Sequence, residues 1–302
     1  MSILVVGSVA YDTVETPFGR AERVLGGSAS FFAVAAAFFA RVNLVGVVGH
    51  DFGEEQLAAF RGRTIDLEGL ERMDGKTFHW QGKYSYDLNA RDTICTDLNV
   101  FELFKPRIPE SYRSSRLVFL GNIDPVLQRE VLAQVDRPQV VGCDTMNFWI
   151  EGKRDELLKT LAEVDVLLIN DSEARELSGE WNMTKAARAI RALGPQTLVI
   201  KKGEHGVVMF TDAGCFSAPA YPLEEVFDPT GAGDTFAGGF MGYLARAKTL
   251  DDETLRRAII MGSTLASFCV EAFSLDRLVT LQRSEIDNRF LLFKRLTHFE
   301  SI

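Results

Sequence analysis

The sequence predicts an α/β protein with a doubly wound, mostly parallel sheet. Short runs of Val, Ile and Leu recur along the 302-residue chain and predict buried strands. Stretches with helical periodicity separate most of these runs, which is typical of a parallel sheet covered by helices on both faces. The apolar runs are 3–6, 44–48, 117–120, 140–141, 166–169, 198–200 and 207–210, and the helical stretches include 31–39, 54–60, 155–161 and 184–193.

One stretch departs from that alternation and predicts strands outside the core. Residues 76–99 place polar residues mostly between apolar ones and contain no helix-length apolar stripe. Such a pattern fits either an edge sheet or a cover over a substrate. The chain contains no linker rich in Pro, Gly or Ser and no repeat, so we expect one domain over residues 1–302 with an inserted flap. The apolar residues of the flap are Phe78, Trp80, Tyr84, Tyr86, Leu88, Ile94 and Leu98.

Composition excludes several classes of partner. The chain has 42 acidic and 33 basic residues, and a formal net charge of -9 repels nucleic acid and anionic lipid. Its most apolar segment, residues 29–40, is shorter than the roughly 20 residues that span a bilayer, and the N-terminus does not resemble a signal peptide. The four cysteines form no CxxC pair and no metal-ligand spacing. We therefore expect a cytoplasmic protein with reduced thiols and neither nucleic acid nor membrane as a partner.

The segment that carries chemistry is DPTGAGDTFAGGF, from Asp228 to Phe240. It predicts a turn that leads into a helix beginning near Asp234 and reaching about residue 247. Gly231 and Gly233 admit backbone conformations or close approaches that a side chain would block. A helix N-terminus preceded by glycines presents unpaired N–H groups, which suit the oxygens of a phosphoryl group. Gly231, Ala232 and Gly233 are therefore a candidate anion hole.

Asp234 stands at the start of this predicted helix. Aspartate is a preferred helix cap, and taken alone the residue could serve only that purpose. A phosphoryl group at the same place would repel a carboxylate that has no other task. The available task is to accept the proton of an attacking hydroxyl, so Asp234 is the candidate catalytic base.

Taken whole, this segment resembles the C-terminal signature of the pfkB carbohydrate kinase family, the ribokinase-like kinases. Thr230–Asp234 and Phe236 match that signature, whereas Pro229 stands where the family often has another residue. The N-terminal signature is similar to Gly26-Gly27-Ser28-Ala29, followed by an alanine-rich helix and by GVVGHD at residues 46–51. The two signatures stand in the family's order and extend the resemblance from Gly7 to about Ala272.

The resemblance implies a ribokinase-like α/β fold with a small β-sheet lid, formed by segments of about 11–20 and 76–99. It also implies an ATP-dependent kinase that transfers the γ-phosphoryl group to a hydroxyl of a sugar or nucleoside. A lid that closes would exclude water from the reaction. The lid could also pair two copies of the chain into a homodimer.

The resemblance further implies a nucleotide side of the site. Asn170 and Glu173 are similar to the family's N-x-x-E motif, which helps to place Mg2+ and the ATP phosphates, although the same spacing is common in helix caps. Lys201, Gly203 and Gly206 lie in a turn whose family counterpart runs along ATP. Ser263 stands where the family often has an asparagine near adenine. ATP and Mg2+ are the expected cofactors, and a monovalent cation such as K+ is left open.

On the acceptor side the match is weaker. Asp12, Gly26, Gly27 and Asn122 are expected to bind the acceptor, while Phe31 stands where the family usually has an asparagine or other polar group. An aromatic ring there would favour the flat base of a nucleoside over a bare sugar, unless the ring belongs to the core of its helix. The sequence therefore does not favour a sugar over a nucleoside as the acceptor, or the reverse.

The sequence leaves two alternative functions beside a kinase, each from a different class of protein. A catalytically idle family member would bind a sugar or nucleoside without turnover, but the chain retains Asp234, the glycines and the Asn170/Glu173 pair. A dinucleotide-dependent oxidoreductase would need G-x-G-x-x-G after the first strand, where GSVAYD stands instead.

Overall fold

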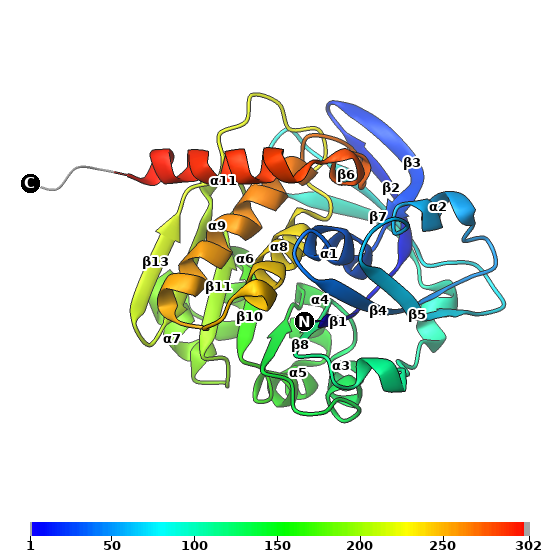
Figure 1. The fold of residues 1–302 in the computed structure, drawn as a ribbon, viewed down its shortest axis with the longest axis horizontal. Helices are drawn as coiled ribbons and strands as arrows, with labels where there is room; N and C mark the ends of the chain where they lie inside the picture. The colour runs from blue at the N-terminus through cyan, green and yellow to red at the C-terminus, as the bar shows by residue number, and fades with distance from the viewer. Residues whose placement is uncertain (1, 299–302) are drawn as a thin grey trace, which may run out of the picture.

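The structure, a computed structural model that describes residues 2–298, contains a nine-stranded sheet and a separate four-stranded sheet (Figure 1). The large sheet has the order β13-β12-β11-β10-β9-β8-β1-β4-β5. Every neighbouring pair from β11 to β5 is parallel, whereas β12 is antiparallel to both of its neighbours. The strands are β1 (Ser2–Val6), β4 (Arg41–Val48), β5 (Ile65–Arg72), β8 (Leu117–Leu120), β9 (Val140–Cys143), β10 (Val166–Asn170), β11 (Thr197–Lys201), β12 (Val207–Thr211) and β13 (Gly214–Ala218).

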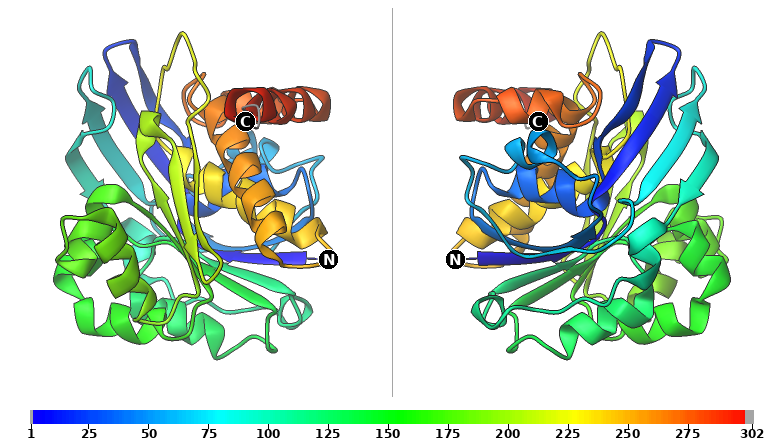
Figure 2. Two further views of the ribbon diagram at one scale, coloured as in Figure 1. Left: turned by 90° about the vertical axis from the view of Figure 1, so that its left-hand side faces the viewer. Right: turned by 90° about the vertical axis from the view of Figure 1, so that its right-hand side faces the viewer.

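Two layers of helices cover the large sheet because its strands are apolar on both faces. Along β1, Ile3 and Val5 join one core cluster, whereas Leu4 and Val6 join the other, as successive strand residues point to opposite faces. Figure 2 shows helices on both sides of this sheet. The first layer holds α1 (Ser28–Ala36), α8 (Ala232–Arg246), α9 (Asp252–Cys269), α10 (Asp276–Thr280) and α11 (Arg283–Thr297); the second holds α3 (Pro125–Leu132), α4 (Asn147–Gly152), α5 (Arg154–Leu161), α6 (Asp171–Ser178) and α7 (Met183–Arg191).

The doubly wound α/β prediction is confirmed, and several helix boundaries differ from expectation. The helix expected at residues 31–39 is α1, and it starts earlier because the chain leaves Gly27 at φ 93 directly into the helix. It ends at Ala36, since residues 37–40 turn toward β4. The helix expected near Asp234 begins two residues earlier, immediately after Gly231 in the left-handed region. The short helix α2 (Glu54–Ala58) lies within the expected stretch 54–60.

The small sheet is built from β2 (Ala10–Thr16), β3 (Gly19–Gly26), β6 (His79–Tyr84) and β7 (Arg91–Asp97), in the order β3-β2-β6-β7. It therefore contains the two segments predicted for the lid, and the first of them extends to Gly26. The central pair β2 and β6 is parallel, while the two outer pairs are antiparallel hairpins. Short 3-10 turns, η1 (Asn99–Leu103) and η2 (Glu110–Tyr112), lead from β7 back to the large sheet.

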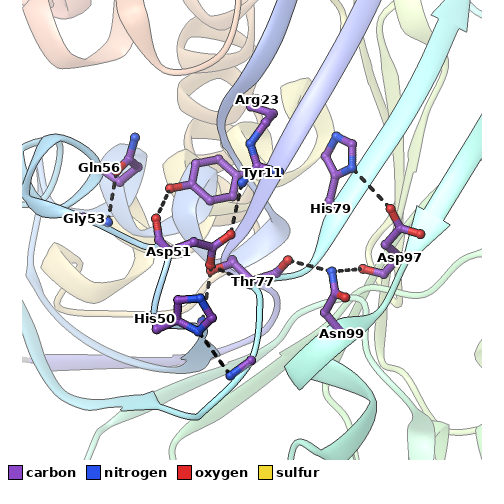
Figure 3. A network of polar contacts seen from close by, with 12 residues as sticks. Tyr11, Arg23, His50, Asp51, Gly53, Gln56, Thr77, His79, Asp97 and Asn99 are labelled. Carbon is purple, nitrogen blue, oxygen red and sulfur yellow. Dashed lines mark hydrogen bonds and ion pairs between the residues drawn. The ribbon is translucent and has the colours of Figure 1, made fainter.

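A polar network joins the base of the small sheet to the loop after β4 (Figure 3). Asp51 Oδ1 accepts hydrogen bonds from the Thr77 N–H at 2.8 Å and the Thr77 hydroxyl at 2.7 Å. Arg23 of β3 donates to Asp51 Oδ2 at 3.0 Å, and the Tyr11 hydroxyl of β2 donates to the Asp51 carbonyl at 2.9 Å. Asp51 of the GVVGHD segment thus connects β2, β3 and the residues just before β6 to the loop after β4.

Two further observations concern the chain as a whole. No helix within residues 2–298 is both long and apolar enough to cross a bilayer. Cys95, Cys143, Cys215 and Cys269 are all free thiols.

Candidate active site

The loop before α8, predicted as an anion hole, turns sharply at Gly231. Gly231 has φ 75, and a Cβ at this position would lie 2.5 Å from the ring atoms of Phe31, so only glycine fits. Asp228 braces the loop: its Oδ1 accepts the Thr230 N–H at 2.8 Å and its Oδ2 accepts the Ser274 N–H at 3.4 Å. The Ala232 N–H donates to the Pro229 carbonyl at 3.2 Å. The N-terminal turn of α8 follows, with N–H groups that have no helical acceptor.

Asp234 lies in this first turn of α8. Burial raises the pKa of its carboxyl to about 7, and the negative charge of Asp144 adds to the rise, while Lys201 and Arg91 oppose it. A carboxyl with a pKa close to the working pH is well matched to general-base catalysis. The position and the pKa of Asp234 therefore suit the role that the sequence suggested.

Sequence reasoning missed Asp144, which comes directly after β9. Its Oδ2 lies 3.5 Å from Nζ of Lys201 at the end of β11, and its Oδ1 accepts the Thr145 N–H at 2.8 Å. Burial raises the pKa of Asp144, whereas the Lys201 ammonium lowers it. The available signal was its place, because ligand sites in such sheets lie beyond the carboxyl ends of the strands.

Asn170 and Glu173 form a capping box at the start of α6. Asn170 Oδ1 accepts the Glu173 N–H at 2.8 Å, and Glu173 Oε2 accepts the Asn170 N–H at 2.8 Å. The geometry of this pair is therefore that of a helix cap. Burial, followed by the charge of Asp144, raises the pKa of Glu173 to about 7. The two carboxylates thus face a common region beside Lys201.

Asp12 is the carboxylate predicted on the acceptor side of the site. It lies in β2, is 6% exposed, and its pKa is raised to about 7 by burial and then by Asp228 and Asp234. A Cβ at Gly26 would lie 2.0 Å from Asp12 Oδ2, so this glycine makes room for the carboxyl group. The Gly27 N–H donates to the Asp12 carboxyl and partly offsets the rise in its pKa. Asp12, Gly26 and Gly27 therefore lie together, within electrostatic range of Asp234.

Two other acceptor-side residues lie differently. The Phe31 side chain is 1% exposed and packs beneath Gly231, so in this conformation its ring offers almost no surface to a ligand. The Asn122 amide contacts its own neighbours: its oxygen accepts the Trp149 indole N–H at 2.9 Å, and its nitrogen lies 3.0 Å from the Met146 sulfur. The neighbouring Phe32 stacks on Phe119 in the core, with ring centroids 4.4 Å apart.

The remaining nucleotide-side residues occupy β11, the following turn and α9. Gly203 begins η3 (Gly203–His205) and Gly206 follows it, and the Lys202 N–H closes this turn on the Gly206 carbonyl at 2.8 Å. A Cβ at Gly203 would lie 2.1 Å from Oδ1 of Asn89, which belongs to the β6–β7 turn of the small sheet. Ser263 is 9% exposed in the middle of α9.

The donor set fits Mg2+ only as part of a complex with nucleotide. Within residues 2–298, no group of three or more His, Cys, Asp or Glu side chains could hold a metal ion alone. Asp144 and Glu173 nevertheless provide two neighbouring carboxylates, and the Thr145 hydroxyl beside them is buried without a partner in the described chain. Mg2+ commonly binds through one or two carboxylates together with phosphate oxygens and water.

Comparison with known proteins identifies the family. A family model described as pfkB family carbohydrate kinase matches residues 2–279. The chain belongs to the pfkB family of carbohydrate kinases. It is accordingly an ATP-dependent phosphotransferase that acts on a hydroxyl of a sugar or nucleoside. A cytidine kinase from Thermococcus kodakarensis is 31% identical to this pfkB kinase over 258 residues, which cover 83% of this chain and 91% of the relative.

Solved structures agree with the family's fold. A Burkholderia thailandensis nucleoside kinase in complex with inosine has a TM-score of 0.75 and 21% identity, and the match covers 96% of this chain and 98% of that one. A ribokinase from Thermotoga maritima has a TM-score of 0.75 and 23% identity, with 97% and 99% covered. The pfkB kinase described here therefore has the ribokinase fold.

Proposed function

We propose that this pfkB kinase phosphorylates a ribose hydroxyl of a nucleoside, with Asp234 as the catalytic base. The observation that carries the choice of a nucleoside is the similarity to the cytidine kinase, which extends over 91% of that enzyme. The placement of Asp12 near Asp234 supports the choice of a sugar hydroxyl, because a hydroxyl held by one carboxylate would be close to the other.

In the proposed reaction an acceptor hydroxyl attacks the γ-phosphorus of ATP. The new bond forms between the acceptor oxygen and phosphorus, the bond from phosphorus to the β–γ bridging oxygen breaks, and ADP leaves. Asp234 accepts the hydroxyl proton. Backbone N–H groups of Gly231, Ala232 and Gly233 stabilise the charge on the transferring group, which requires the Ala232 N–H to turn from the Pro229 carbonyl toward the ligand.

The nucleotide would lie across the ends of β10 and β11. Lys201 would contact the phosphates, and the backbone at Gly203 and Gly206 would line the nucleotide, with Ser263 near its base. Asp144, Glu173 and Asn170 would hold Mg2+ directly or through water. When bound, Mg2+ would neutralise part of the phosphate charge. A monovalent cation such as K+ is a separate proposal, which turnover in K+ and Na+ buffers tests.

The remaining proposals concern the small sheet, the oligomeric state and the cellular compartment of the enzyme. We propose that residues 1–302 form one domain in which the small sheet is a lid over Asp12 and the acceptor; residues 1 and 299–302 lie outside the described structure. The outer strands β3 and β7 would offer their free edges to a second copy in a homodimer, which light scattering tests. Four free thiols support a reducing compartment, the cytoplasm.

The test is ATP consumption with Mg2+ in the presence of pyrimidine and purine nucleosides, pentoses, hexoses and sugar phosphates. Turnover with one nucleoside, with a monophosphate product identified by mass spectrometry, supports the proposal. Turnover with a sugar alone would instead support the second candidate function, a sugar kinase. Similarity to a Lactococcus lactis ribokinase, which is 27% identical over 85% of this chain, favours that candidate. No turnover with any acceptor, together with normal ATP binding, would indicate an idle binding protein.

A further inference from the structure

The order of strands in the large sheet reverses between β1 and β8. From β1 the chain continues on one side to β4 and β5, whereas β8, β9, β10 and β11 follow one another on the other side. In open α/β sheets, ligands bind beyond the carboxyl ends of the strands at such a switch point. Gly7, which follows β1, and Gly121, which follows β8, therefore border the expected position of a ligand.

Glycines let the chain approach closely at this switch point. A Cβ at Gly121 would lie 3.0 Å from the Ser28 hydroxyl oxygen, and a Cβ at Gly7 would lie 2.6 Å from the same atom. Ser28 directly follows Gly27, which belongs to the acceptor side of the site. Asn122, the residue after Gly121, is therefore the first residue with a side chain on the β8 side of the switch point.

The segment after β9 fixes the amide group of Asn122. The Asn122 oxygen accepts the Trp149 indole N–H at 2.9 Å, and its nitrogen lies 3.0 Å from the Met146 sulfur. An indole N–H can only donate, so it determines which end of the amide is the oxygen. Lys153, at the C-cap of α4, pairs with Asp124 and lies 6.0 Å from the Trp149 ring centroid. Trp149 is thus held in place and sets the orientation of the Asn122 side chain.

Gln128 of α3 fixes the backbone on either side of this contact. It is 1% exposed, and its Nε2 donates to the Gly121 carbonyl at 2.9 Å and to the Asp144 carbonyl at 3.1 Å. One buried amide thus ties the residue before Asn122 to the residue after β9. The Asn122 side chain therefore stands on a backbone that is held relative to Asp144 on the nucleotide side.

The Asn122 amide keeps hydrogen-bonding capacity for a ligand. A side-chain amide has two N–H donors and two oxygen lone pairs, and its contacts within residues 2–298 use one of each. Asn122 is half-buried rather than enclosed. A hydroxyl group both donates and accepts, so it can pair with the remaining N–H or the remaining lone pair.

We propose that Trp149 is a positioning residue for the acceptor: its indole holds the Asn122 amide in the orientation that binds an acceptor hydroxyl. This inference rests on the kinase function proposed above, and it holds for a nucleoside or a sugar, since both present hydroxyls. Trp149 acts through Asn122 rather than by touching the acceptor. A binding group whose rotamer is locked by a neighbouring hydrogen bond loses less conformational freedom when the ligand binds.

The kinetic test is a double-mutant cycle of Trp149→Phe and Asn122→Ala, with Trp181→Phe as the matched control. Trp181 is 85% exposed, and phenylalanine keeps an aromatic ring beneath Arg175. Trp149→Phe should lower kcat/KM for the acceptor by about 10-fold, the effect of one hydrogen bond, and change the KM of ATP by less than about twofold. In the Asn122→Ala background it should change kcat/KM by less than about twofold, because no amide remains to be held. Equal effects of Trp149→Phe in both backgrounds, or a loss no larger than that of Trp181→Phe, would overturn the proposal.

An NMR test needs no turnover and separates this inference from the proposed function. The indole N–H groups of the three tryptophans give separate signals, and Trp149→Phe identifies one of them. Asn122→Ala should shift the Trp149 signal and leave the Trp181 signal in place. Titration of the wild type with cytidine and with D-ribose should shift the Trp149 signal for whichever compound binds.

The possible failures are distinguishable. A Trp149 signal that is unmoved in Asn122→Ala, or unmoved when cytidine or D-ribose binds, would contradict the positioning role of Trp149. Absence of turnover with every acceptor of the panel would instead remove the kinase function, whatever the Trp149 signal does.

Discussion

The Lys201 ammonium lies 3.5 Å from the Asp144 carboxylate, directly beside the start of α8. Gly233 makes room for it, since a Cβ at that position would lie 2.9 Å from Lys201 Nζ. The ends of β9 and β11 thus place one buried ion pair under the residues that precede Asp234. Because the cation is shared among several carboxylates, its removal should be felt both in stability and in the site.

Lys201→Met should lower the free energy of unfolding at pH 8 by about 3 kcal/mol, because it leaves Asp144 buried without its partner. It should also weaken ATP binding. Urea denaturation and nucleotide titration measure the two effects. Lys202→Met, one residue along in the same turn, is the control and should change neither quantity. Equal effects of the two substitutions would show that the ion pair is not what matters.

Asp234→Asn should lower kcat by about 10²–10⁴-fold, the range expected for loss of a general base. The amide keeps the shape of the side chain but cannot take up the hydroxyl proton. Steady-state kinetics measure the loss, while calorimetry with ATP should show nearly unchanged binding. Near-normal turnover in this variant would rule out Asp234 as the base.

The rate of the wild-type enzyme should depend on pH through Asp234, whose pKa is raised to about 7. The base works only when deprotonated, so kcat/KM should rise with pH up to about 7 and then level off. A pH series of kcat/KM at constant ionic strength measures this dependence. A profile that is flat between pH 5 and 8 would contradict the raised pKa.

The stability of the wild-type protein should depend on pH in the opposite direction to its rate, and comparison with Asp234→Asn isolates this effect. A carboxyl whose pKa rises from 3.8 to about 7 on folding binds more protons in the native state than in the unfolded state within that window. Wild-type stability should therefore fall as pH rises from about 4 to 7. Asp234→Asn removes this term, so its Tm should exceed that of the wild type by on the order of 5 °C at pH 8 and match it near pH 4. Calorimetric melting curves of both proteins across this range decide the matter.

Gly231→Ala should disrupt the anion-hole loop more than its backbone angle alone explains. Gly62 has a similar φ, 71 against 75, but a Cβ at Gly62 would meet nothing within 4 Å, whereas one at Gly231 would meet the Phe31 ring. Gly62→Ala should therefore cost about 1 kcal/mol for the left-handed backbone, and Gly231→Ala about 2 kcal/mol more. Chemical denaturation of both variants measures the difference, and kcat should fall only in Gly231→Ala. Equal losses of stability in the two variants would mean that the Phe31 ring moves aside at no cost in free energy.

Much of the fold followed from local patterns in the sequence. The apolar runs at residues 117–120 and 166–169 predicted strands because a strand buried on both faces needs apolar side chains at consecutive positions. The polar and aromatic alternation in residues 76–99 likewise predicted strands apart from the main sheet, which β6 and β7 form. Helix boundaries were less accurate, since α1 and α8 begin where glycines at φ 93 and 75 end the preceding loop.

In the candidate site, too, some features followed from local sequence and others arose only from the tertiary structure. The sequence by itself determined the α/β alternation, the glycine loop before α8 and the position of Asp234 in its first turn, because each depends on residues close together in the chain. Only the tertiary structure brought Asp144 to Lys201 and put Phe31 beneath Gly231. These contacts depend on strand order and register across the two sheets. Periodicity tells which face of its own element a side chain occupies, but not which distant element covers that face.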